Sequence, residues 1–235
     1  MTVDEVVKEL RAMGSETIKK VLMKHGAKEP FYGVKVEDLK KIQKRVKTDH
    51  QLALALYDTG ISDAMYLAGL IADDAKMTKK DLQKWLKKAS WKMVSDYTVP
   101  WVAAGSPHGW ELALEWIDAK DEAAASAGWQ TLSSVVSIRD DDDLDIPALK
   151  KLLERVKKTI HKAPDRVRYT MNGFVIAVGS YVAWLTDDAI KTAEAIGPVT
   201  VDMGDTSCKV PFAPDYIRKV KDRGTIGKKR KSAKC

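Results

Sequence analysis

Hydrophobic residues recur at spacings of three and four along nearly the whole chain, and this period predicts α-helices. Val3, Val6, Val7 and Leu10 form the first such stripe, within the first dozen residues. A second stripe contains Ile18, Val21 and Leu22, and a third contains Val36, Leu39, Ile42 and Val46. Further helical patterns cover about 49–58, 62–72, 78–88, 91–104, 107–117, 120–137, 146–162, 165–184 and 186–196. The pattern therefore predicts an all-α protein.

The predicted helices are short and are separated by turn or cap signals such as Gly14-Ser15 and Ser106-Pro107. Many short helices without a sustained heptad favour helix pairs stacked as an α-solenoid, and a globular helical bundle is the alternative. No fixed-period repeat is present, so any repeat is degenerate. We expect one repeat domain over residues 1–222, followed by a basic, disordered tail over 223–235.

One segment breaks the helical pattern. Residues 199–210 alternate β-forming side chains around Met203-Gly204-Asp205, which predicts a short β-hairpin. Pro211 and a short helix at about 213–222 follow it.

The charge is unevenly distributed. The chain has 40 Lys and Arg against 33 Asp and Glu, a net charge of +7. Residues 217–235 hold nine cations and one anion, so this tail carries +8 and the remainder carries −1. A basic tail adds non-specific affinity for nucleic acid, and a solubilising terminus or contact with an anionic membrane is the alternative. A basic surface on the body requires that charges be sorted onto one face.

Such sorting is visible in the predicted helix at 146–162. Lys151, Arg155, Lys158 and Lys162 are spaced by four, three and four residues, so they share a face that can follow a phosphate backbone. A solvated helix face is the alternative. Two further groups strengthen the DNA-binding interpretation, namely Lys40, Lys44 and Lys47, and the pair Arg166 and Arg168.

The chain contains seven tryptophans, and most are expected in the core. Trp91 and Trp129 lie near predicted helix starts, where a ring can face a groove and contact a base or sugar; burial is the alternative for each. The four histidines are scattered, Asp140–Asp143 is expected to be a solvated loop, and the two cysteines are isolated. We therefore predict no metal site and no cofactor, and a monomeric cytoplasmic protein without a membrane segment.

Three segments together resemble the AlkD-type DNA alkylation repair superfamily, which consists of HEAT-like repeat DNA glycosylases and their relatives. They are residues 31–41 (FYGVKVEDLKK), residues 63–72 (DAMYLAGLIA) and residues 90–96 (SWKMVSD), the last of which lies where the family has Trp-x-x-Val-Asp. The resemblance implies a curved solenoid of HEAT-like repeats whose basic concave face grips duplex DNA. Active members of the family excise N3- and N7-alkylated purines.

This sequence keeps few of the residues that the resemblance implies at the functional positions of the family. Trp91 and Val94 match the motif, but its carboxylate falls on Ser95, and Asp96, the only candidate carboxylate, comes one residue late. The resemblance implies an arginine near Trp129 and a second tryptophan at Ile176, and this sequence has neither.

We therefore expect a protein that binds distorted or branched DNA through backbone contacts, without robust glycosylase activity. In that interpretation Lys209 and the expected hairpin are part of the DNA-binding surface. An active alkylpurine glycosylase using Asp96 and a protein-interaction scaffold are the alternatives.

Overall fold

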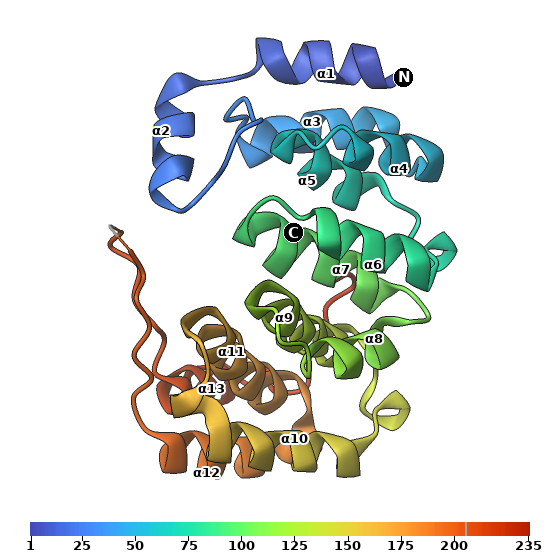
Figure 1. The fold of residues 1–235 in the computed structure, drawn as a ribbon. Helices are drawn as coiled ribbons and strands as arrows, with labels where there is room; N and C mark the ends of the chain where they lie inside the picture. The colour runs from blue at the N-terminus through green and yellow to red at the C-terminus, as the bar shows by residue number, and fades with distance from the viewer. Residues whose placement is uncertain (205) are drawn as a thin grey trace. The chain divides into compact units, whose positions relative to one another are not determined.

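The computed structural model describes residues 1–204 and 206–235, and it confirms the all-α prediction (Figure 1). Contacts divide the chain into two compact units, where the sequence predicted one repeat domain over 1–222. In a repeat array each helix contacts only its neighbours, which favours such a division.

Unit 1 comprises residues 1–108 with Gly204, Thr206 and Lys234–Cys235, and unit 2 comprises 109–203 and 207–233. The helices of unit 1 are α1 (Val3–Ala12), α2 (Glu16–Lys24), α3 (Val36–Val46), α4 (His50–Asp58), α5 (Ser62–Ile71), α6 (Lys79–Lys88) and α7 (Val99–Gly105). Those of unit 2 are α8 (Gly109–Trp116), α9 (Glu122–Ile138), α10 (Ile146–Thr159), α11 (Asp165–Tyr181), α12 (Thr186–Ile196) and α13 (Ala213–Asp222).

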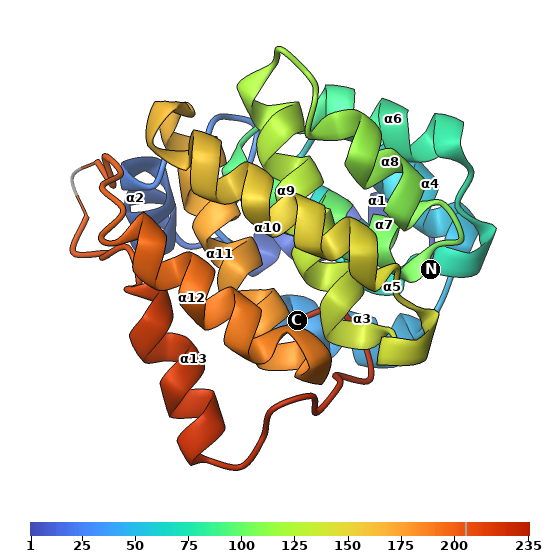
Figure 2. The ribbon, with the colours of Figure 1, turned by 90° about the horizontal axis from the view of Figure 1, so that it is seen from below.

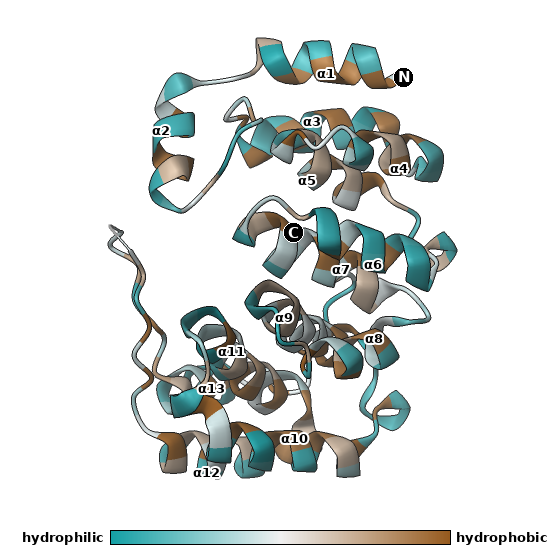
Figure 3. Cartoon of the chain, in the orientation of Figure 1, coloured by the Kyte–Doolittle hydropathy of each residue, from teal (hydrophilic) through white to brown (hydrophobic). Residues whose placement is uncertain are grey.

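The core of unit 1 is built around α5. All ten residues of this helix are buried, and it packs against α3, α4 and the segment that precedes α7. The helices around it are amphipathic, and Figure 3 shows the hydrophilic side of α6 turned outward. Tyr57 of α4 stacks on Trp85 of α6 with the ring centroids 4.0 Å apart, which places both rings in the core as the helical period requires.

The core of unit 2 is built around α9 and α11, which lie side by side (Figures 1 and 2). Trp129 of α9 is fully buried against Phe174 of α11. Of the two positions considered for this tryptophan, facing a groove or lying in the core, the structure shows the core. Two glycines allow helices to approach closely. A Cβ on Gly128 would lie 2.6 Å from the Ile117 nitrogen of the α8 end, and a Cβ on Gly179 would lie 2.6 Å from Ile217 of α13.

The predicted hairpin is wrong. Residues 199–204 and 206–210 contain no strand, and residue 205, at the expected turn, lies outside the described residues. Side chains of α11 hold both ends of the segment instead. Arg168 donates a hydrogen bond to the Thr200 carbonyl (2.7 Å), and Asn172 donates one to the Pro211 carbonyl (2.9 Å). Alternating β-formers favour a strand only where a packed partner supports them.

The basic tail makes specific contacts, which differs from the disorder we expected. Within unit 2, Lys229 Nζ lies 2.8 Å from Asp141 Oδ1 and donates to the Val136 carbonyl (2.9 Å) near the end of α9. Within unit 1, Lys234 Nζ lies 2.7 Å from Asp74 Oδ1 and donates to the Ala72 carbonyl (2.7 Å) after α5. A lysine at a helix C-terminus satisfies carbonyls that the helix leaves unpaired.

No single helix in the described part of the chain is long and apolar enough to cross a membrane. The pair formed by α11 and the stretch Ala183–Ile196, which is bent by 114°, has sufficient length and apolar composition when taken together. Ten residues of α11 are buried in unit 2, as in a core helix.

Candidate nucleic-acid interface

The segment that resembles the family motif contains a π turn. Val94–Thr98 is π-helical, and the Val99 amide donates to the Val94 carbonyl five residues back. A π turn accommodates one residue more than an α turn and often occurs at functional sites. It therefore absorbs the additional residue, Ser95, that separates Val94 from Asp96, and the helix continues from Val99 without a break.

Asp96 itself is buried. Only 2% of its surface is exposed, and its Oδ1 accepts a hydrogen bond from the Ser95 hydroxyl (3.0 Å). A carboxylate that stabilises positive charge on a sugar has to reach that sugar. In this structure the carboxylate of Asp96 lies in the interior of unit 1.

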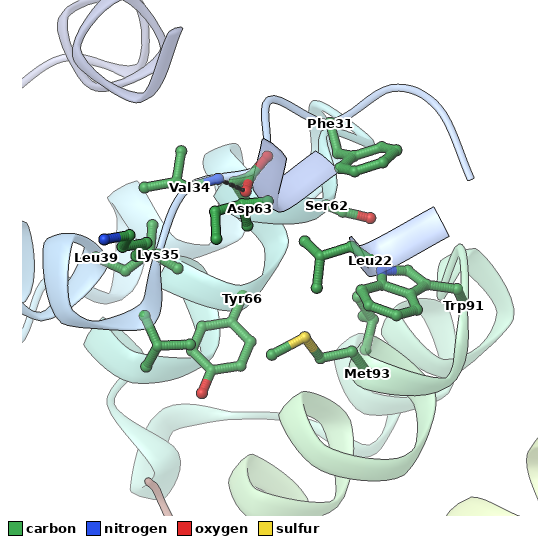
Figure 4. Close-up of a pocket in the computed structure, with 13 residues that line it drawn as sticks. Leu22, Phe31, Val34, Lys35, Leu39, Ser62, Asp63, Tyr66, Trp91 and Met93 are labelled. Atoms are coloured by element: carbon green, nitrogen blue, oxygen red, sulfur yellow. Dashed lines mark hydrogen bonds between the residues drawn. The ribbon is translucent and has the colours of Figure 1, made fainter. Parts of the chain in front are cut away.

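Trp91 lies at the edge of an apolar pocket of about 230 Å³ in unit 1 (Figure 4). We call this the α2 pocket. Its lining comes from α2, the loop before α3, the first turns of α3, α5 and the segment before α7: Ile18, Leu22, Phe31, Val34, Lys35, Val36, Leu39, Ser62, Asp63, Tyr66, Trp91, Met93 and Val94. The indole nitrogen of Trp91 is buried and has no hydrogen-bond partner in the described part of the chain.

Asp63 fixes the wall of this pocket. Its Oδ2 accepts from the Tyr32 amide (2.6 Å) and its Oδ1 accepts from the Val34 amide (2.9 Å). The side chain is buried at the start of α5, so the carboxylate ties the loop before α3 to that helix. Two of the segments that resemble the family, residues 31–41 and 63–72, are thus joined by one residue whose role the sequence alone did not indicate.

The candidate cations on α3 differ in their surroundings. Lys41 and Arg45, which share this cationic face, are paired with Asp38 and Glu9. Lys44 and Lys47 are exposed, and no carboxylate among the described residues pairs with either one. Lys40 is half-buried, with its Nζ 3.7 Å from Cys235 Sγ.

The cation row on α10 and on the 3-10 turn that follows it (Ile160–Lys162) is interrupted. Lys151, Lys158 and Lys162 are exposed, and none has a carboxylate partner within the described residues. Arg155, by contrast, pairs with Asp118 (2.7 Å), donates to the Ile117 carbonyl (3.1 Å) and lies 5.6 Å from the Trp129 ring centroid. Arg155 therefore attaches α10 to the end of α8 and to α9, while the three lysines remain available for phosphates.

The other two candidates also lie in unit 2. The Arg166 guanidinium lies 4.9 Å from the Tyr169 ring centroid, at the start of α11. Lys209 is exposed, in the segment between α12 and α13. Arg168, the neighbour of Arg166 in the sequence pattern, pairs with Asp165 (3.1 Å) and binds the Ala163 carbonyl, so it has a structural role.

Some of the cations of α13 and the tail are paired with carboxylates within the protein. Arg218 pairs with Glu194 and Lys221 with Asp187, which attaches α13 to α12. Lys229 is bound to Asp141 in the same unit. Part of the +8 of residues 217–235 is therefore compensated within the protein. These pairings could not be predicted, because each carboxylate is distant along the chain.

Comparisons with known proteins identify the family. The family model described as "DNA alkylation repair enzyme" matches residues 6–201. The uncharacterized proteins Lin0241 of Listeria innocua serovar 6a and Lmo0209 of Listeria monocytogenes serovar 1/2a are 33% and 32% identical over 229 residues, covering 95% of this chain and 99% of each relative.

One solved structure is similar over 100% of both chains, with a TM-score of 0.92 and 36% identity. It is described as representing a new family of proteins related to the HEAT-like repeat DNA glycosylases, with affinity for branched DNA structures. This similarity supports the HEAT-like repeat fold. Because the family model matches most of its length, the chain belongs to the DNA alkylation repair family.

Proposed function

We propose that this protein binds branched or otherwise distorted duplex DNA through phosphate contacts and lacks robust glycosylase activity. The similarity over the full chain to a structure described as having affinity for branched DNA carries this proposal. The exposed lysines without carboxylate partners on α3 and α10 support it, because such side chains can neutralise phosphates without first breaking an ion pair.

The proposed contacts include Lys44 and Lys47 in unit 1 and Lys151, Lys158 and Lys162 in unit 2. Each phosphate that a lysine neutralises releases counterions, so affinity should fall steeply with salt and depend little on base sequence. Branched DNA is distinguished from a linear duplex by the positions of its phosphates, and backbone contacts are sufficient to read that difference.

The test compares binding to a four-way junction and to a linear duplex of the same sequence at several salt concentrations. The double variant Lys151→Ala/Lys158→Ala should reduce the slope of log affinity against log salt by about 1.8, at about 0.9 per phosphate contact. The matched control Lys84→Ala/Lys88→Ala removes two lysines that are both bound to Asp58, and it should leave the slope nearly unchanged. Equal effects of the two double variants, or no preference for the junction, would refute the proposal.

An active alkylpurine glycosylase is the second candidate, and the π turn is the observation that favours it, because it brings an extra residue into the motif without ending the helix. Burial of Asp96 argues against it. Incubation with methylated duplex DNA and measurement of released base separates the two candidates. Base release that Asp96→Asn abolishes would establish the glycosylase.

A further inference from the structure

The α2 pocket has features of a ligand site as well as of a gap in packing. Its wall carries three aromatic rings, from Phe31, Tyr66 and Trp91, among aliphatic side chains. Its volume of about 230 Å³ is below the range of about 300–1,000 Å³ that is usual for drug-sized ligands. The space therefore suits a small, flat molecule that can lie against aromatic side chains.

The polar groups of the pocket specify the hydrogen bonding of such a molecule. The Trp91 indole nitrogen is a donor only, and it is buried without a partner among the described residues. The Ser62 hydroxyl contacts the Ser90 hydroxyl (2.8 Å), which leaves it further hydrogen-bonding capacity. A buried donor without an acceptor costs free energy, so an occupant that offers an acceptor is favoured.

The charged groups of the pocket are already engaged. Both oxygens of Asp63 accept backbone amides, and Lys35 at the rim is paired with Glu37 (3.5 Å). Neither group is free to bind a charged ligand inside the pocket. The occupant is thus expected to be uncharged.

The helix that covers the pocket is loosely held. α2 has no buried residue, and Val21 and Met23 on it are 48% and 55% exposed. Its side chains Ile18 and Leu22 line the pocket, and Figure 4 shows Leu22 and Trp91 on the same side. A cover with few buried contacts opens at low cost, which allows a ligand to enter.

We propose that the α2 pocket binds a planar, uncharged heteroaromatic ring of the nucleobase class, with the ring against Tyr66 and Trp91 and an acceptor nitrogen facing the Trp91 indole N–H. The base can be free or can be an unpaired base of bound DNA. The second source rests on the proposed DNA binding, and the first does not.

The test uses 2-aminopurine, a fluorescent purine whose emission is quenched by stacking. It is added to the full-length protein as the free base, within a duplex as a bulged nucleotide, and within a duplex as a paired nucleotide. We expect saturable quenching of the free base, the bulged base or both. The emission of the paired base should change only as much as DNA binding itself changes it. A response of the free base alone identifies a free ligand, and a response of the bulged base alone identifies an extruded base; either supports the proposal.

Three variants assign the response to the pocket. Trp91→Phe keeps a ring and removes the donor, and it should weaken binding about three- to tenfold, the effect of one hydrogen bond. Leu22→Trp fills the pocket and should abolish the quenching while circular dichroism shows a folded protein. Trp184→Phe removes a tryptophan that is 62% exposed in unit 2, and it should change nothing.

Two results would overturn the proposal. One is the absence of saturable quenching with both free and bulged 2-aminopurine, and the other is binding that Trp91→Phe and Leu22→Trp leave unchanged. Binding to a four-way junction without 2-aminopurine, measured by anisotropy, is recorded in parallel. A protein that binds the junction but fails the quenching test refutes only the pocket, and one that binds free 2-aminopurine but no junction refutes only the DNA-binding function.

Discussion

Replacement of Asp63 should destabilise unit 1 more than any surface change, because its carboxylate accepts two backbone amides. Asp63→Ala leaves the Tyr32 and Val34 amides without their acceptor. Each amide left unsatisfied costs about 1–3 kcal/mol, so the loss should be about 2–6 kcal/mol. Water that reaches the partly buried Tyr32 amide brings the loss to the lower end of this range. Asp63→Asn keeps one acceptor oxygen and should lose about half as much.

Urea unfolding followed by circular dichroism measures the loss, and hydrogen exchange of the Tyr32 and Val34 amides localises it. Asp49→Ala is the matched control, because within the described residues the Asp49 side chain accepts only the Leu52 amide (3.0 Å), at the start of α4. Its removal should cost about 1 kcal/mol. If Asp63→Ala costs no more than Asp49→Ala, or if both amides exchange at wild-type rates, the carboxylate does not hold the loop.

Three further predictions follow from buried groups. Tyr57→Phe should lower the free energy of unfolding by about 1–3 kcal/mol in urea titrations, because the Trp85 carbonyl loses the hydroxyl that donates to it (2.6 Å). Gly128→Ala should lower the thermal midpoint, because its Cβ would lie 2.6 Å from the Ile117 nitrogen; such overpacking costs about 1–3 kcal/mol. Burial raises the pKa of the Asp74 carboxyl above its ordinary value, so stability is lost as pH rises through the raised pKa. Urea titrations should therefore show that Asp74→Asn gains stability relative to wild type as the pH is raised from acidic to neutral.

Helices could be predicted from this sequence because their evidence is local. The amphipathic period of α10 follows from Leu149, Leu152, Leu153 and Val156, which are all buried as that period requires. The hairpin prediction for residues 199–210 was wrong because a strand depends on a partner strand. Alternating side chains do not indicate whether such a partner is present. Here α11 supplies hydrogen bonds to its two ends through Arg168 and Asn172.

The candidate site could be predicted only in part, because pairing between distant residues is invisible in a helical period. Arg155 and Lys158 occupy equivalent positions in the cation row, yet Arg155 is bound to Asp118 and Lys158 is exposed without a carboxylate partner in the described chain. The structure of the motif could not be predicted either. The local sequence does not indicate that a π turn accommodates the added Ser95 and leaves Asp96 buried.

Two lysines of the basic tail are bound within the protein, and this changes what the tail can contribute to DNA binding. A formal charge contributes to counterion release only if the cation can leave its protein partner for a phosphate. Lys229 and Lys234 each bind a carbonyl near a helix end and an acidic residue after it, so transfer to DNA would leave a carboxylate and a carbonyl uncompensated. These lysines are better explained as helix-end contacts. The affinity of the protein for DNA should then follow the exposed lysines of the body together with the exposed cations of the tail that no carboxylate in the described chain pairs with, namely Lys219, Arg223, Lys228 and Lys231.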